Sequence, residues 1–285
     1  MAIVGSGKYK YELIRPWPNI PKYWVLGECT DSAVNSKGEV HIFSRGKHPL
    51  TIWDASGNFI SSWGEGLFKS PHGIFIDNED QIWLVDTLDH VVTKHEPNGN
   101  LILTLGQRGL PAYSFQGLPF NMPSGIALAP NGEIFVSDGY GGHRVHRFTS
   151  TGNLLLSWGK EGNGPGEFVN LHNIGVDKLG RVYICDREND RIQIFDNDGN
   201  YLQQWDIIEP NDLFIQDELI YVASDKTWIS IWDLKGENLA RFGGNESAPS
   251  KPIMESVHGI SVDNQGSIFI TETVVNGRVT KLQRL

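Results

Sequence analysis

The chain has 285 residues, a mass of 31.8 kDa and a formal net charge of −10, because 34 Asp and Glu outnumber 24 Lys and Arg. This balance disfavours non-specific binding to nucleic acid or to an anionic membrane surface, so we expect neither as a partner. Hydrophobic residues make up 39% of the chain, with 32 Gly and 14 Pro spread along it. Enough apolar material for one large core, interrupted by frequent turn residues, favours many short strands over a helical bundle.

The cellular location is predicted from the start of the chain, its apolar runs and its cysteines. The first residues lack a basic flank followed by an apolar stretch, and no apolar run approaches the roughly 20 residues that cross a bilayer. The two cysteines, Cys29 and Cys185, are far apart and form no CxxC motif. We therefore expect an unexported, cytoplasmic protein with free thiols, with a single disulfide as the less favoured alternative.

One pattern recurs six times: a small polar or histidine residue, an apolar strand, a turn, a second strand, a loop and a third strand. The copies average about 47 residues, which is the length of a four-stranded propeller blade. Their recurrent ending, which begins with Gly-Asn and closes on Trp in 57–63, 152–158 and 199–205, resembles the NHL type of repeat. The sequence predicts one all-β domain, a six-bladed β-propeller over residues 1–285, with repeats starting near Asp31, His72, Ser124, His172, Asn211 and His258.

The two ends of the chain are predicted to share a blade. The sixth copy stops at Leu285 without a fourth strand, while an alternating segment with Tyr9, Tyr11 and Leu13 precedes the first copy. We expect this N-terminal segment to supply the outer strand of the last blade, which closes the ring and removes an exposed edge.

The residues that start the repeats are predicted to surround the central channel, because the innermost strand of every blade lines it. Histidine occupies this position in the second, fourth and sixth copies. Three converging neutral imidazoles are typical of a catalytic zinc, and iron, nickel or cobalt accept the same ligands. We predict that His72, His172 and His258 bind a metal, with a hydrogen-bonded polar channel as the alternative. We place Asp31 at the same register of the first copy. It is interpreted as a fourth ligand, an orienting residue or a general base, with a turn cap as the structural alternative.

A second set of residues lies where the second strand of each copy ends, around one predicted mouth of the channel. Arg45 and Arg187 occupy equivalent positions in the first and fourth copies, where two guanidiniums can bind a carboxylate. Tyr140 of the third copy adds a phenol that can exchange a proton once a metal or guanidinium lowers its pKa. The carboxylates that recur at this point are interpreted as turn-stabilising acceptors of backbone hydrogen bonds: Asp86, Asp138 and Asp186.

Six further histidines fall outside the shared register and are interpreted as surface or strand residues: His41, His48, His90, His95, His143 and His146. Among them, His90 lies in a loop that can face the mouth.

Four segments carry a family resemblance: HIFSRGKH around Arg45, SPHGIFIDNEDQIWLVD around His72, IFVSDGYGGHRV around Tyr140 and DRENDRIQIF around Arg187. With the axial histidines, they make the chain resemble the lyase domain of peptide amidation, peptidyl-α-hydroxyglycine α-amidating lyase, over nearly its whole length. The resemblance implies that the three axial histidines bind zinc. It also implies that the two arginines and Tyr140 serve the cleavage of a carbinolamide into an amide and glyoxylate.

Three positions depart from that family. Ser256 stands where the family has a methionine two residues before the last zinc histidine, and Gly259 replaces a carboxylate that contributes to a structural calcium. Gly141 replaces a disulfide-forming cysteine that follows the tyrosine. The glycine at 259 argues against the structural calcium, and the missing cysteine agrees with an unexported protein.

These residues favour a metal-dependent lyase that acts on a small, hydroxylated, carboxylate-bearing substrate. The first alternative is a metallohydrolase that uses the same axial metal and a bound water on an amide, ester or lactone, and it is favoured if Asp31 is a base. The second alternative is a non-catalytic NHL propeller scaffold, which predicts a channel without metal and a broad basic or apolar face. The sequence leaves the oligomeric state open.

Overall fold

The computed structural model describes residues 2–113, 120–224, 227–244 and 253–285. These residues form strands joined by turns, with one short 3-10 helix, η1 (Arg187–Asn189). Among them, no helix is long and apolar enough to cross a membrane. The predicted all-β fold class is confirmed.

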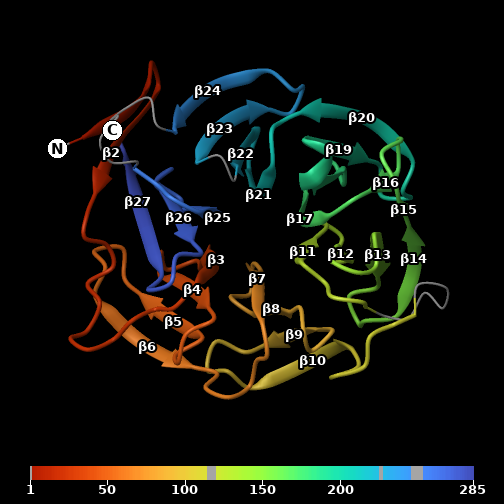
Figure 1. Ribbon diagram of the computed structural model, residues 1–285, viewed down its shortest axis with the longest axis horizontal. Helices are drawn as coiled ribbons and strands as arrows, with labels where there is room; N and C mark the ends of the chain where they lie inside the picture. Colours follow the sequence, from red (N-terminus) through yellow and green to blue (C-terminus); the bar gives the residue numbers. More distant parts are fainter. Residues whose placement is uncertain (1, 114–119, 225–226, 245–252) are drawn as a thin grey trace. The chain divides into compact units, whose positions relative to one another are not determined.

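Six antiparallel sheets correspond to the six predicted repeat copies, one blade to a copy (Figure 1). The first blade comprises β3 (Cys29–Val34), β4 (Val40–Ser44), β5 (Leu50–Trp53) and β6 (Phe59–Trp63). The second comprises β7 (Pro71–Ile76), β8 (Ile82–Asp86), β9 (Val91–His95) and β10 (Leu101–Gly106). The third comprises β11 (Gly125–Leu128), β12 (Ile134–Asp138), β13 (Arg144–Phe148) and β14 (Leu154–Trp158).

The fourth and fifth blades repeat the same up-and-down order. The fourth comprises β17 (Leu171–Val176), β18 (Val182–Asp186), β19 (Arg191–Phe195) and β20 (Tyr201–Asp206). The fifth comprises β21 (Pro210–Gln216), β22 (Leu219–Ser224), β23 (Trp228–Asp233) and β24 (Asn238–Gly243). A short parallel pair, β15 (Lys160–Glu161) and β16 (Glu167–Phe168), lies in the connection between the third and fourth blades.

The sixth blade joins the two ends of the chain, as predicted. Its own strands are β25 (Val257–Val262), β26 (Ile268–Glu272) and β27 (Arg278–Arg284), and β2 (Tyr9–Ile14) pairs antiparallel with β27. In Figure 1 the red β2 lies beside the blue β27. The sequence did not predict the additional strand β1 (Ile3–Ser6), which pairs with β2 and makes this sheet five-stranded.

The strands fall into two compact units. One unit, residues 66–210, holds the second, third and fourth blades. The other unit combines residues 1–65 with residues 211–285 and holds the first, fifth and sixth blades.

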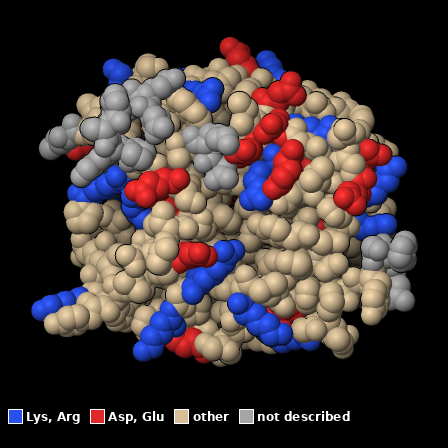
Figure 2. All heavy atoms as spheres, in the orientation of Figure 1, with Lys and Arg blue, Asp and Glu red and all other residues tan. Residues whose placement is uncertain are grey.

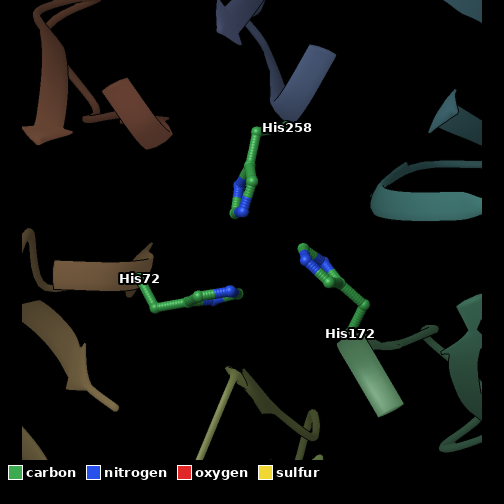
Figure 3. Close-up of side chains that lie close together, drawn as sticks. All are labelled: His72, His172 and His258. Carbon is green, nitrogen blue, oxygen red and sulfur yellow. The ribbon is translucent and has the colours of Figure 1, made fainter. Parts of the chain in front are cut away.

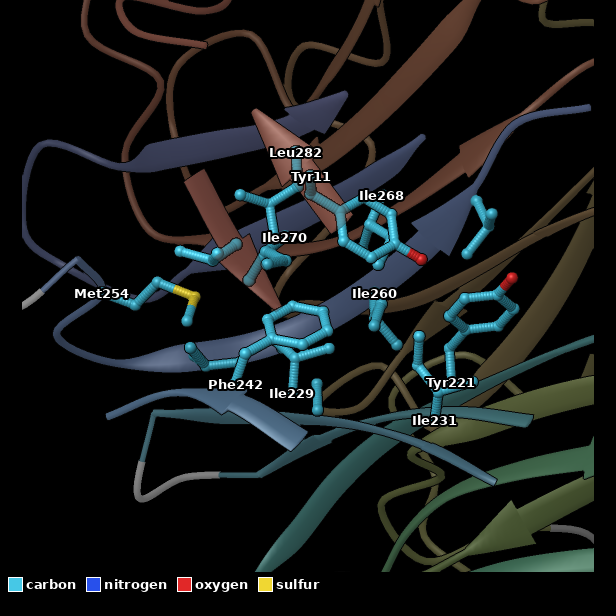
Figure 4. Packing of buried hydrophobic residues seen from close by; sticks show 14 of the residues in the cluster. Tyr11, Tyr221, Ile229, Ile231, Phe242, Met254, Ile260, Ile268, Ile270 and Leu282 are labelled. Carbon is cyan, nitrogen blue, oxygen red and sulfur yellow. The ribbon is translucent and has the colours of Figure 1, made fainter. Parts of the chain in front are cut away.

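A buried hydrophobic cluster lies between the fifth and sixth blades of the latter unit (Figure 4). Tyr11 from β2 packs on Phe242 from β24, with ring centroids 5.3 Å apart. Isoleucines from both sheets complete the cluster: Ile229, Ile231, Ile260, Ile268 and Ile270. The N-terminal strand therefore contributes to the core of this unit as well as to its sheet.

We predict that Phe242→Ala destabilises the protein by about 3–5 kcal/mol, because it opens a cavity beside Tyr11 in this cluster. The measurement is the shift of the urea denaturation midpoint. Leu101→Ala is the matched control, because Leu101 is 56% exposed and its truncation should cost less than about 0.5 kcal/mol. Equal midpoint shifts for the two variants would contradict the assigned core.

Candidate functional site

The three predicted metal ligands occupy one structural position in their blades, an irregularity at the start of the inner strand. In β17, Leu171 pairs with Asp186 and Asn173 with Cys185, which leaves His172 as the extra residue of a β-bulge. His258 is the extra residue in β25, and the irregular stretch of β7 contains His72. Bulges re-aim a side chain relative to the regular alternation of a strand. The repeat register predicted for the histidines is therefore confirmed.

Asp31 does not share that register. The bulge of β3 lies between Cys29 and Asp31, so Thr30 takes the histidine position and Asp31 follows it. Asp31 Oδ1 accepts the Ser32 N–H at 2.7 Å, and a Cβ placed on Gly259 would lie 2.6 Å from that oxygen. The structure thus packs Asp31 against the inner strand of the sixth blade. The predicted register of Asp31 is wrong by one residue, because β3 has the same bulge as the histidine strands and its extra residue is Thr30, not the carboxylate that follows it.

His72, His172 and Tyr140 come together within the unit of residues 66–210. The ring centroids of the two histidines are 4.9 Å apart, and their ring nitrogens lie within 4.8 Å of each other. Figure 3 shows these two rings pointing toward one another, and their residues are only 2% and 1% exposed. The Tyr140 ring meets both edge-on, at 5.2 and 5.7 Å between centroids. The structure therefore brings together three of the predicted site residues.

Backbone carbonyls fix the protonation of two histidines. His72 Nδ1 lies 2.6 Å from the Ser124 carbonyl oxygen, and His258 Nδ1 lies 2.7 Å from the Thr30 carbonyl oxygen. A carbonyl only accepts hydrogen bonds, so each Nδ1 carries the proton and each Nε2 carries a lone pair. The Tyr140 hydroxyl, 2.9 Å away, accordingly donates to His72 Nε2. Metal-binding histidines commonly donate their second ring N–H to a carbonyl in this way, so both residues fit a metal.

The recurrent carboxylates hold the loops around these residues. Each is buried and accepts backbone N–H groups from the connection that precedes its own blade. Asp86 accepts from Lys69 and Ser70, at 2.7 and 2.8 Å. Asp138 accepts from Asn121 at 2.9 Å, and Asp186 accepts from Val169 at 3.1 Å. Glu272 does the same for Glu255 in the sixth blade, at 2.6 Å. Their predicted turn-stabilising role is confirmed.

Arg45 and Arg187 occupy equivalent positions in their blades, as predicted. Arg45 Nη1 lies 2.8 Å from Glu28 Oε2, and Arg187 Nη2 lies 2.6 Å from Glu188 Oε1. All four side chains are partly exposed, from 23% to 41%. Exposed ion pairs contribute little to stability, so exchange of these partners for a substrate carboxylate costs little. Sequence reasoning missed both glutamates, although Glu188 directly follows its arginine.

Charged side chains of both signs are interspersed on the face drawn in Figure 2.

The two cysteines and Gly259 bear on other predictions for the site. Cys29 and Cys185 are both buried, and within the described part of the chain neither forms a disulfide, in line with the expectation of thiols. Burial raises the pKa of the Cys29 thiol, so this group stays protonated and is a poor nucleophile. A Cβ atom at position 259 would lie 2.6 Å from Asp31 Oδ1 and 2.6 Å from Thr271 Oγ1. This position therefore has no room for a calcium-binding carboxylate.

Comparison with known proteins relates the chain to propeller lyases. A family model described as a 6-bladed beta-propeller, DUF5128, matches residues 120–227. Over 211 residues the chain is 32% identical to NHL repeat-containing protein 3 of Homo sapiens, covering 70% of this chain and 60% of that protein. Over 229 residues it is 30% identical to peptidyl-glycine alpha-amidating monooxygenase of Mus musculus, covering 68% and 23%. The probable peptidyl-alpha-hydroxyglycine alpha-amidating lyase pgal-1 of Caenorhabditis elegans is 30% identical over 200 residues, covering 60% and 56%.

These curated relatives are longer than the chain, which spans 60% of their length or less. Among solved structures, a streptogramin B lyase superimposes with a TM-score of 0.67 at 15% identity, covering 98% of this chain and 99% of that one. Virginiamycin B lyase from Staphylococcus aureus gives a TM-score of 0.62 at 15% identity, covering 96% and 88%. The six-bladed propeller fold and the resemblance to amidating lyases and NHL repeat proteins are therefore confirmed.

Proposed function

Because the chain is a six-bladed propeller related at about 30% identity to peptidyl-α-hydroxyglycine α-amidating lyases, we propose that it is a metal-dependent lyase. Its proposed substrate is a small α-hydroxy amide with a carboxylate, which it cleaves at the C–N bond into an amide and glyoxylate. The observation that carries this proposal is the group formed by the buried His72 and His172 with Tyr140, whose oxygen lies 2.9 Å from the nitrogen that His72 would offer to a metal.

The metal is proposed to be held by His72, His172 and His258, with zinc as the first choice and iron, nickel or cobalt as alternatives. The three residues share the bulge position in alternate blades, and equivalent positions of a propeller surround its axis. His72 and His258 offer Nε2 lone pairs while backbone carbonyls hold their Nδ1 protons. When bound, the metal supplies a Lewis acid for a substrate oxygen.

Tyr140 is the proposed proton-transfer group. Its oxygen lies 2.9 Å from His72 Nε2, and its ring meets both imidazoles edge-on. In the proposed reaction Tyr140 gives its hydroxyl proton to the departing amide nitrogen and takes the proton of the substrate hydroxyl in its place, while the C–N bond breaks. The oxygen that loses the proton becomes the aldehyde oxygen of glyoxylate, and the phenol ends as it began, so that atoms and charge balance.

Arg45 and Arg187 are proposed to bind the substrate carboxylate. Each guanidinium is partly exposed and its present partner is a neighbouring glutamate that a substrate carboxylate can replace. We do not assign Asp31 a catalytic part, because it follows the bulge and packs between blades.

The test combines metal analysis with product detection. We expect the protein, purified without chelators, to carry a transition metal and to release glyoxylate from N-acyl-α-hydroxyglycines faster than the heat-denatured protein does. A parallel panel of simple esters, amides and lactones tests the metallohydrolase alternative. Hydrolysis without glyoxylate release would replace the lyase proposal with a hydrolase.

The scaffold alternative keeps one supporting observation, the similarity to NHL repeat-containing protein 3. Absence of metal after reconstitution with zinc, iron or nickel, together with absence of turnover, would favour it over both enzymes. We also propose a cytoplasmic location, supported by the two buried cysteine thiols, which suit a reducing compartment.

A further inference from the structure

One hydrogen bond recurs at the mouth loops of the blades. The first residue of the loop donates its backbone N–H to a carbonyl in the connection that precedes the blade: Arg45 to Glu28 at 2.9 Å, Thr87 to Ser70 at 3.1 Å, Arg187 to Asn170 at 3.0 Å and Thr273 to Ser256 at 3.0 Å. In the third blade, where β12 ends at Asp138, the donor is the second loop residue, Tyr140, which bonds the Met122 carbonyl at 3.2 Å. The hydrogen bond thus recurs at these five loops, and in the third blade Tyr140 is its donor.

The third blade adds a side-chain contact to this shared frame. Asn121 donates its backbone N–H to both Asp138 carboxylate oxygens, each at 2.9 Å, and its side-chain Nδ2 to the Gly141 carbonyl at 3.2 Å. The Asn121 amide fits closely, because a Cβ on Gly141 would lie 2.8 Å from Asn121 Cγ. Asn121 therefore holds both ends of the loop from Asp138 to Gly141, with Tyr140 between them.

A histidine from the second blade supports the other anchor of Tyr140. The Met122 N–H donates to His90 Nδ1 at 3.1 Å, and the Met122 carbonyl accepts from Tyr140. Both His90 and Met122 have a left-handed backbone, with φ of 58° and 69°. Such conformations are costly for residues other than glycine, and they persist where the surrounding structure imposes them.

A similar pair joins the fourth and fifth blades, where the Glu209 N–H donates to Asp190 Oδ1 at 2.9 Å and the two residues have φ of 43° and 52°. The residues equivalent to Met122 in the first, second, fourth and sixth blades lack a positive φ: Glu28, Ser70, Asn170 and Ser256. The pair therefore occurs at two of the described blade connections, and at the third blade it holds the carbonyl that accepts from Tyr140. The contacts at the third blade form a chain of hydrogen bonds from His90 through Met122 and Tyr140 to His72.

We propose that Asn121 and His90 are positioning residues, which hold the Tyr140 loop so that the phenol oxygen stays beside the His72 ring. The catalytic consequence rests on the proposed function, because it requires Tyr140 to transfer a proton. The structural claim does not, since it concerns where the phenol lies. Asn121 acts on the loop end at Gly141 and His90 acts through Met122, so neither is placed on the substrate.

Two pairs of variants test the claim. Asn121→Asp keeps the side-chain shape but replaces the Nδ2 donor with an oxygen that faces the Gly141 carbonyl, and Asn98→Asp makes the same exchange at an exposed turn residue. His90→Ala removes the acceptor for the Met122 N–H. His90→Asn restores a side-chain oxygen on a residue that tolerates a left-handed backbone.

The first readout is the NMR spectrum of protein labelled with 13Cζ-tyrosine, in which Tyr140→Phe identifies the Tyr140 resonance. We expect this resonance to shift or broaden in Asn121→Asp and His90→Ala, and to stay at its wild-type position in Asn98→Asp and His90→Asn. An unmoved Tyr140 resonance in His90→Ala and in folded Asn121→Asp overturns the inference. If Asn121→Asp does not fold, the two His90 variants decide.

The second readout is turnover of an N-acyl-α-hydroxyglycine with metal content measured in parallel. We expect kcat to fall about 10- to 100-fold in Asn121→Asp and His90→Ala with unchanged metal content, because displacing a reacting group by about 1 Å has this effect. A shifted resonance with unchanged kcat overturns the catalytic part. A wild-type protein without lyase activity overturns the proposed function, while the resonance still decides the positioning claim.

Discussion

His172→Ala is expected to lose the bound metal and, with it, lyase activity. Three imidazoles are the usual minimum for a catalytic zinc, so removal of one leaves two protein ligands and an affinity too low to survive purification. We expect metal content to fall at least about tenfold and kcat to fall by about 10³ or more. Elemental analysis of the wild-type protein and of His172→Ala, purified in parallel without chelators, measures the metal content. Glyoxylate release by the same two proteins measures kcat.

The matched control for this prediction is His48→Ala. His48 is paired with Glu65 at 2.8 Å and lies outside the bulge positions. Its replacement should leave metal content and turnover unchanged, which separates loss of a ligand from loss of any histidine. Full metal content in His172→Ala would contradict the site assignment and return the axial histidines to the polar-channel interpretation.

The fold was predictable because its signals repeat. Six copies of one strand pattern reinforce each other, and the missing strand at the C-terminal end pointed to the N-terminal segment, which pairs with β27. Strand β1 was not predicted, since its short segment carries no repeat pattern and pairs only with β2. The three histidines were found because one uncommon residue type marks the same repeat position.

Other parts of the site depend on geometry that spacing does not carry. The error at Asp31 arose because Thr30, which takes the histidine position, has no chemistry that singles it out, whereas the carboxylate directly after it does. His90 was interpreted by default as a surface or strand residue. Its contact with the Met122 N–H requires a left-handed backbone at both His90 and Met122, which the repeat pattern does not reveal. Asn121 was detectable in principle, because it precedes Asp138 by the same 17 residues that separate Val169 from Asp186.

Tyr140→Phe is expected to separate metal binding from chemistry. The phenylalanine ring keeps the edge-on contacts with His72 and His172 but lacks the hydroxyl that lies 2.9 Å from His72 Nε2. Metal content should therefore stay at the wild-type value, while kcat falls by about 10² to 10⁴, the usual contribution of a positioned proton-transfer group. Metal analysis and glyoxylate release on the same preparations measure both quantities.

Tyr201→Phe is the matched control, because Tyr201 is 37% exposed on an outer strand of the same unit and should tolerate loss of its hydroxyl. Together, His172→Ala and Tyr140→Phe distinguish the candidate functions. If Tyr140→Phe loses activity but keeps its metal, the reaction needs the phenol itself. A non-catalytic scaffold has no such need. A metallohydrolase that activates water on the metal would keep most of its turnover without this hydroxyl. Wild-type kcat in Tyr140→Phe would therefore remove the proton-transfer role and favour hydrolysis over C–N cleavage.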